Sequence, residues 1–269
     1  MTCDSPFYVL PKAGTEKVPV PCGRCPVCKR KRASSWAFRL KQHERKCPAS
    51  FVTLTYDTDH VPISVNGFPT LCKRDVQLFY KRLRKLCPGI RIKYYTVGEY
   101  GTQGLRPHYH AILYGAIDQS IIDQAWGLGS THVGTVTGAS IEYTLKYISK
   151  PPNPRVGKFS RDDRVREFSL MSKGLGVDFL SDAATKFHHS RIDQLYVTVE
   201  GGVKLSMPRY YRNKIWNESE RRRQSTIIQA VVALEQSKDT RTPAEIDAQR
   251  YERHRRFYHR TKFHSNEVL

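Results

Sequence analysis

The stretch Tyr95–Leu113 reads YTVGEYGTQGLRPHYHAIL and joins two short apolar runs, Ile90–Val97 and His108–Tyr114. The segment between them, Gly101–Pro107, is rich in residues that favour turns. Two apolar runs separated in this way are typical of a β-hairpin. The stretch therefore predicts an antiparallel pair of strands.

Two histidines, His108 and His110, flank Tyr109 on the second of these strands. Successive side chains of a strand point to opposite faces, so the two imidazoles share one face and Tyr109 lies on the other. Two neighbouring imidazoles can bind one divalent metal, and the hairpin would bring Glu99 up to them. Histidines with this spacing also occur on strands that bind no metal. We predict a metal site formed by Glu99, His108 and His110.

A helix is predicted over Ala139–Ser149, ASIEYTLKYIS, because apolar residues recur in it at helical spacing. Tyr143 and Tyr147 are four residues apart and share one side of this helix, with Lys146 between them. A tyrosine phenolate can attack a phosphodiester phosphorus and form a covalent link, and a nearby ammonium can stabilise the charge that develops. The alternative is a pair of tyrosines that only packs in the core.

The charge of the chain favours a polyanionic partner. Its 269 residues include 45 Lys and Arg against 25 Asp and Glu, a net charge of +20. Such an excess favours binding to nucleic acid, whose backbone is a dense row of phosphates. No apolar run is long enough for a transmembrane helix, and the first residues do not resemble a secretion signal. We expect no membrane partner.

Seven cysteines, an odd number without a secretory context, argue against a disulfide framework. Three of them, Cys22, Cys25 and Cys28, lie in PCGRCPVCKRKR, and Cys3 can complete a four-sulfur zinc site. A redox Cys-x-x-Cys pair would need a βαβ setting that is absent here. An incidental cluster, or one in which only two cysteines bind metal, is the remaining alternative.

The other predicted elements give an α+β protein, with a central antiparallel sheet flanked by helices. Helices are predicted at Lys29–Lys46, Thr70–Leu86 and Ile117–Trp126, strands at Phe51–Tyr56 and Thr131–Val136, a short helix after the glycines of Phe168–Leu180, and a hairpin at Tyr196–Leu205. We divide the chain into a Cys-rich zinc-binding segment (1–32), an endonuclease domain with a hairpin extension (33–215) and a basic helical tail (216–269). The candidate DNA-binding residues are Lys29, Arg30, Lys31, Arg32 and Arg106.

At this point VGEYGTQGLRPHYHAIL, followed by YTLKYISK, resembles the His-hydrophobe-His replication initiators, which are rolling-circle endonucleases of small single-stranded DNA replicons. With PCGRCPVCKRKR and FVTLTYD in the same order, the chain is most similar to the replication initiation proteins of microviruses, in particular gokushovirus-type bacteriophages. The resemblance covers about Cys3 to Leu180.

The resemblance implies a sheet of ferredoxin or RNA-recognition-motif type. It implies that Glu99, His108 and His110 bind Mg²⁺ or Mn²⁺, that Tyr143 cleaves, and that Tyr147 alternates with it beside the motif lysine, Lys146. The strand Phe51–Tyr56 matches a family motif with no chemistry of its own. Tyr109 stands where the family has an aliphatic residue, and it is bulky and apolar enough to face the core.

The implied function is nicking and rejoining of single-stranded DNA at a phage origin through a 5′-phosphotyrosine link, in the host bacterial cytoplasm. A host helicase and polymerase are expected partners, since the chain has no Walker A sequence of its own. One alternative is a non-catalytic protein that binds single-stranded nucleic acid. The other is a relaxase or transposase of the same superfamily, but His60 and His132 lack the spacing of the third histidine typical of relaxases.

Overall fold

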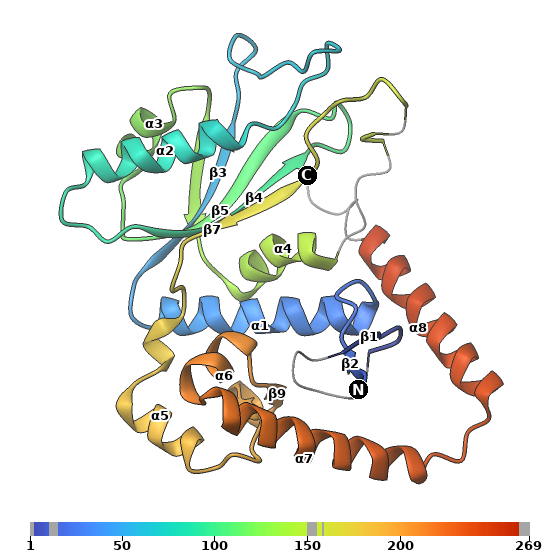
Figure 1. Ribbon diagram of the computed structural model, residues 1–269. Helices are drawn as coiled ribbons and strands as arrows, with labels where there is room; N and C mark the ends of the chain where they lie inside the picture. The colour runs from blue at the N-terminus through green and yellow to red at the C-terminus, as the bar shows by residue number, and fades with distance from the viewer. Residues whose placement is uncertain (1–2, 11–15, 150–154, 158, 264–269) are drawn as a thin grey trace. The chain divides into compact units, whose positions relative to one another are not determined.

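A computed structural model describes residues 3–10, 16–149, 155–157 and 159–263 (Figure 1). The chain forms two compact units. One combines Met1–Arg39 with Val177–Arg260, and the other is built around Leu40–Gly176. The division at residues 32 and 215, which rests on composition, stays a prediction.

The second unit contains the central sheet, and we call it the sheet unit. Its elements are β3 (Ala49–Thr55), α2 (Lys73–Leu86), β4 (Lys93–Tyr100), β5 (Pro107–Tyr114), α3 (Gln119–Trp126), β6 (Thr131–Thr135), α4 (Gly138–Ser149) and β7 (Phe168–Met171). The strand order is β6-β3-β5-β4-β7, and every neighbouring pair is antiparallel. The run from β3 to β6 follows the β-α-β-β-α-β order of ferredoxin-like folds. The predicted α+β class is confirmed.

Helices cover both faces of this sheet: α2 and α3 lie on one face and α4 on the other (Figure 1). The alternation of side chains along β3 and β5 decides which residues face which layer. The core between the sheet and the α2–α3 layer includes Val52, Leu54, Tyr109, Ala111, Val76, Phe79, Leu83, Ile122 and Trp126. His108 and His110 alternate with these residues and therefore face the α4 side.

Tyr109 is fully buried in that core. Its hydroxyl lies 2.9 Å from the Tyr56 hydroxyl and accepts a hydrogen bond of 2.8 Å from the Cys72 N–H. Its partner in register on β4 is Gly98, where an added Cβ would come within 3.0 Å of the Tyr109 ring. A glycine there leaves room for the large ring, so the expectation that Tyr109 faces the core is confirmed.

The other unit, which we call the terminal unit, joins both ends of the described chain. Its elements are β1 (Phe7–Val9), β2 (Val18–Val20), α1 (Pro26–Glu44, which continues beyond Arg39), the 3-10 helices η1 (Val177–Phe179) and η2 (Glu200–Gly202), α5 (Asp182–His189), β8 (Tyr196–Thr198), β9 (Lys204–Ser206), α6 (Arg209–Ile215), α7 (Glu218–Ser237) and α8 (Pro243–Phe263). Its core includes Phe38, Val197, Met207, Tyr211, Ile215 and Trp216. The predicted hairpin and helical tail are confirmed.

Several elements differ from the prediction for local reasons. Helix α1 begins at Pro26 rather than Lys29, because proline is well suited to the first turn of a helix. Strand β4 continues to Tyr100, so Glu99 lies inside it. The four residues of β7 have no alternating pattern long enough to predict a strand, and pairing with β4 creates it. None of the helices in the described part of the chain is long and apolar enough to cross a membrane.

Candidate functional site

Glu99, His108 and His110 converge at one point of the sheet. Glu99 lies directly opposite His108 in the β4–β5 register. Its Oε1 atom lies 3.4 Å from His108 Nε2 and 2.9 Å from His110 Nε2. The predicted hairpin thus brings a carboxylate to two imidazoles, and one donor atom from each residue lies within 4.8 Å of the others.

The far side of each imidazole is also held. His108 Nδ1 lies 3.2 Å from the backbone oxygen of Arg106, and His110 Nδ1 lies 3.0 Å from Thr53 Oγ1. The Phe51 ring stacks on His110 at 5.4 Å between centroids and 8° between planes. Partners of this kind orient metal-binding histidines in many proteins. With both Nε2 atoms facing a carboxylate, the group fits a divalent cation.

Thr53 and Phe51 are functional neighbours that the sequence did not reveal. The expectation that their strand has no chemistry of its own is wrong in this respect, since Thr53 supports His110. A signal was present in the alternation of FVTLTYD. It places Thr53 and Thr55 on the face opposite Val52 and Leu54, which are buried.

The electrostatics of the group favour an ionised carboxylate. Glu99 is only 3% exposed, and burial alone would raise its pKa. Hydrogen bonds and charge interactions with His108 and His110 outweigh burial and lower the pKa of Glu99 to about 2. Burial opposes the charged form of His108, but Glu99 outweighs that effect and raises the pKa of His108.

Tyr143 lies at this group. Its hydroxyl donates to Glu99 Oε1 at 3.2 Å and lies 3.5 Å from His110 Nε2. The edge of its ring meets the His110 ring at 5.1 Å between centroids. Burial raises the pKa of Tyr143, and the negative charge of Glu99 raises it further. In this state Tyr143 is therefore a neutral phenol held against the carboxylate.

The other two candidates on α4 lie beside Tyr143. The Tyr147 ring centroid is 6.2 Å from that of Tyr143, and Lys146 Nζ is 4.8 Å above the Tyr143 ring. Ile141 and Leu145 are buried on the other side of the helix, as its apolar spacing predicts. The packing of this apolar face directs Tyr143 toward the sheet.

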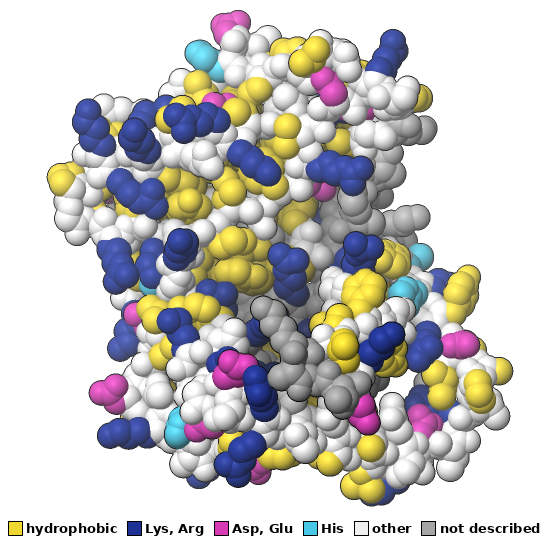
Figure 2. Space-filling model, viewed as in Figure 1, with side chains coloured by type: hydrophobic (Ala, Val, Ile, Leu, Met, Phe, Trp, Pro, Cys, Tyr) yellow, Lys and Arg dark blue, Asp and Glu magenta, His cyan; other side chains and the backbone are white. Residues whose placement is uncertain are grey.

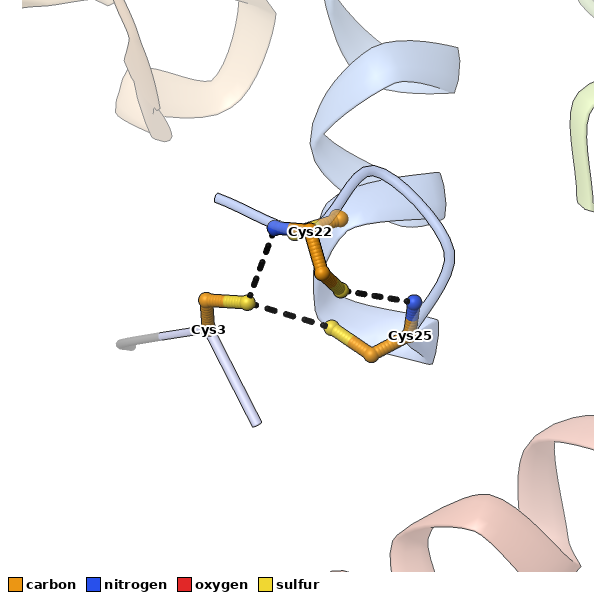
Figure 3. A group of neighbouring side chains, drawn as sticks. Cys3, Cys22 and Cys25 are labelled. Atoms are coloured by element: carbon orange, nitrogen blue, oxygen red, sulfur yellow. Dashed lines mark hydrogen bonds between the residues drawn. The ribbon is translucent and has the colours of Figure 1, made fainter. Parts of the chain in front are cut away.

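The four predicted zinc ligands form the second group with metal-binding geometry among the described residues (Figure 3). The sulfur atoms of Cys3, Cys22, Cys25 and Cys28 all lie within 4.8 Å of one another. The Cys22 N–H donates to Cys3 Sγ at 3.3 Å, and the Cys25 N–H donates to Cys22 Sγ at 3.3 Å. Gly23 adopts the left-handed conformation that this turn requires, with φ of +72°.

The chemistry of this donor set matches zinc, which is typically held by four sulfurs in a closed structural site. Burial raises the pKa of Cys22, but hydrogen bonds from the Cys25 and Arg24 amides outweigh it and lower the pKa to about 6. Burial raises the pKa of Cys28 to about 12. Cys22 is therefore the cysteine of this pair that ionises more readily.

The candidate DNA-binding residues differ in their exposure. Arg30, Lys31 and Arg32 are exposed on α1, and Lys29 is half-buried with its ammonium 5.4 Å from the Tyr258 ring centroid. Arg106 is exposed, and its guanidinium donates to the Tyr56 backbone oxygen at 2.9 Å. Further Lys and Arg side chains gather over α2 (Figure 2).

The two remaining histidines of interest lie outside the metal group. His60 pairs with Asp57 at 2.7 Å. His132 is exposed on β6, opposite Thr53 in register. Within the described ranges the group therefore contains two histidines, as the sequence spacing predicts.

Comparison with known proteins relates the sheet unit to replication proteins. Residues 49–152, from β3 to the end of α4, match a family described as replication-associated protein ORF2. The chain is 27% identical to the replication-associated protein ORF2 of Spiroplasma virus 4, over 74% of this chain and 68% of that protein. It is 26% identical to the replication-associated protein ORF4 of Chlamydia phage 1, over 72% of this chain and 53% of that protein.

A third relative is the replication-associated protein VP4 of Bdellovibrio phage phiMH2K, which is 26% identical over 72% of this chain and 66% of that protein. The alignments thus cover between about half and two thirds of the lengths of these relatives. No solved structure matches the chain significantly. The resemblance to replication proteins of microviruses is confirmed.

Proposed function

We propose that this chain initiates phage DNA replication by nicking single-stranded DNA at an origin, with Tyr143 as the nucleophile. The observation that carries the proposal is the position of the Tyr143 hydroxyl, 3.2 Å from Glu99 Oε1 and 3.5 Å from His110 Nε2. A candidate nucleophile and a candidate metal group thus meet at one point. The match to replication-associated proteins supports the same role.

In this proposal Glu99, His108 and His110 hold Mg²⁺ or Mn²⁺. The bound cation would polarise a non-bridging oxygen of the scissile phosphate and offset the charge that develops there. The ionised Glu99 supplies the anionic ligand. The supports from Arg106 and Thr53 keep both imidazole Nε2 atoms directed at the same point.

The Tyr143 oxygen forms a bond to the phosphorus while the bond from phosphorus to the 3′ oxygen breaks. The phenol loses its proton, and the departing 3′ oxygen gains one. The product is a 5′-phosphotyrosine link and a free 3′ hydroxyl that a host polymerase can extend. Lys146, above the Tyr143 ring, stabilises the phenolate electrostatically.

Tyr147 would perform the second transfer. It lies one helical turn from Tyr143 on the same side of α4, so both tyrosines can reach one metal group in turn. Attack by Tyr147 on the regenerated junction, followed by attack of the free 3′ hydroxyl on the first link, would close a unit circle. A host helicase would separate the strands, and the reaction would take place in the host bacterial cytoplasm.

The four-cysteine group would bind structural zinc in the terminal unit. The four sulfurs and the two amide-to-sulfur hydrogen bonds support this assignment. Metal analysis of the purified chain should find about one zinc per chain. A chain without zinc would contradict the assignment.

The function is tested with a labelled origin oligonucleotide and Mn²⁺. The wild-type chain should form a covalent adduct, Tyr143→Phe should form almost none, and EDTA should abolish the reaction. Tyr8→Phe, at an exposed tyrosine of β1, is the control for loss of a hydroxyl elsewhere.

Three outcomes would contradict the proposal at different levels. An adduct at normal yield from Tyr143→Phe, with loss only in Tyr147→Phe, would exchange the two roles. Cleavage by the double variant would refute the tyrosine mechanism. Binding of the oligonucleotide without cleavage under every condition would favour a non-catalytic binding protein.

A further inference from the structure

One side of α8 forms the wall of a cleft in the terminal unit. The cleft has a volume of about 530 Å³ and is lined by Asp4, Ser5, Arg250, Tyr251, His254, Arg255 and Tyr258. Tyr251, His254, Arg255 and Tyr258 are spaced i, i+3, i+4 and i+7, which places them on one side of the helix. The volume falls within the range of small-molecule sites.

The exposed part of the cleft is aromatic and cationic. Tyr251 is 72% exposed, although large aromatic side chains are usually more buried. Arg250 and Arg255 are exposed and form surface ion pairs, with Asp247 at 3.1 Å and Glu252 at 2.9 Å. Surface pairs of this kind contribute little, so both guanidinium groups can exchange partners with a phosphate.

The inner wall of the cleft carries a buried acceptor. The Asp4 side chain is 4% exposed, and its Oδ1 accepts from Arg253 at 2.9 Å. Its Oδ2 lies 3.4 Å from His254 Nε2 but accepts no hydrogen bond with good geometry from the described residues. A buried acceptor of this kind commonly has a partner. A donor entering the cleft would supply one.

The cysteine group fixes this inner wall. Asp4 directly follows Cys3, and the Asp4 amide donates a hydrogen bond to Cys25. Asp4 meets Arg253 across a separation of 249 residues. The four-cysteine group and α8 thus build the cleft together from opposite ends of the chain.

We infer that this cleft is a subsite for single-stranded DNA, distinct in its residues from the proposed nicking group. Tyr251 and Tyr258 stack on bases, while Arg250 and Arg255 contact phosphates. Asp4 accepts a hydrogen bond from the exocyclic amino group of a base, as acidic side chains do with cytosine. The buried carboxylate would repel an acidic peptide, which favours a nucleic acid over such a partner.

This inference deepens the proposed function, because it rests on single-stranded DNA being the substrate. The test uses the full zinc-loaded chain without added Mg²⁺ or Mn²⁺, and a fluorescent single-stranded oligonucleotide that lacks the origin. Fluorescence anisotropy gives the Kd. Tyr251→Ala should raise the Kd about fivefold to tenfold, in the range of one lost stacking contact. Tyr251→Phe, which keeps the ring, should bind as the wild type does.

Two matched controls separate the cleft from general effects. Tyr8→Ala removes a tyrosine of similar exposure, 64%, that does not line the cleft. Arg255 and Arg256 both pair with Glu252, but only Arg255 lines the cleft. Arg255→Ala should therefore reduce the slope of log Kd against log salt by about 0.7, the value for one phosphate contact on a single strand. Arg256→Ala should reduce it less.

The inference is overturned if Tyr251→Ala and Arg255→Ala bind the oligonucleotide as tightly as their controls. It is also overturned if an acidic peptide displaces the oligonucleotide from the wild type but not from Tyr251→Ala. The adduct assay keeps the two proposals apart. Weak binding by Tyr251→Ala together with a wild type that forms no covalent adduct would leave the subsite standing and refute nicking, and the reverse pattern would do the opposite.

Discussion

Replacing Thr53 with valine tests whether the second contact of His110 supports metal binding. Valine has nearly the same shape as threonine, so the main loss is the 3.0 Å contact between Thr53 Oγ1 and His110 Nδ1. A threonine hydroxyl can donate or accept. It therefore suits His110 with a proton on Nε2, when that atom donates to Glu99, and His110 with a proton on Nδ1, when Nε2 binds a metal. Valine suits neither form.

We expect Thr53→Val to weaken Mn²⁺ binding about 10-fold to 100-fold, the usual cost of losing such a partner. This corresponds to about 1.4 to 2.8 kcal/mol of binding free energy. Fold stability should change less, by about 1 kcal/mol, because one hydrogen bond is lost from a half-buried position. Calorimetric titration with Mn²⁺ measures the affinity, and the Mn²⁺ dependence of adduct formation measures the consequence.

Thr55→Val is the matched control. Thr55 lies two residues along the same strand and is opposite His108 in register, but its hydroxyl donates to the Ser130 backbone oxygen at 2.9 Å. It should leave Mn²⁺ affinity unchanged. Equal loss of affinity in both variants would show a general effect of the strand, and wild-type affinity in Thr53→Val would refute the role of Thr53.

Three further predictions concern the rest of the molecule. Cys28→Ser should lower the zinc content of the chain, measured by metal analysis, whereas Cys72→Ser, outside the group, should not. Gly129→Ala should lower the free energy of unfolding by about 3 kcal/mol, because φ is +147° and a Cβ would collide with the backbone of Thr55 and Asp57. Gly104→Ala, which meets open space, is its control in thermal unfolding. Asp162→Asn should speed hydrogen exchange over residues 159–165, since Asp162 pairs with Arg164 at 2.7 Å and accepts from the Gly157 amide. Arg164 lowers the pKa of Asp162 below 3.8, so this stabilisation is complete above that pH, and the difference should shrink only as the pH falls below it.

Much of the site could be predicted because its residues lie close together along regular elements. The alternation of a strand places His108 and His110 on one face, and the period of a helix places Tyr143 beside Tyr147. A hairpin brings Glu99 to them through a short turn, and strand pairing confirms that register. These relations depend on local geometry, so the sequence by itself determined them.

Other relations depend on packing between distant segments. The contact of Thr53 with His110 exists because β3 pairs with β5, 57 residues further along the chain. Strand β7 is created by the free edge of β4 rather than by its own pattern. The cleft at α8 needs Asp4, which lies 249 residues from Arg253. No local period encodes such contacts, because they arise only when buried faces pack against one another, and the tertiary structure alone decided them.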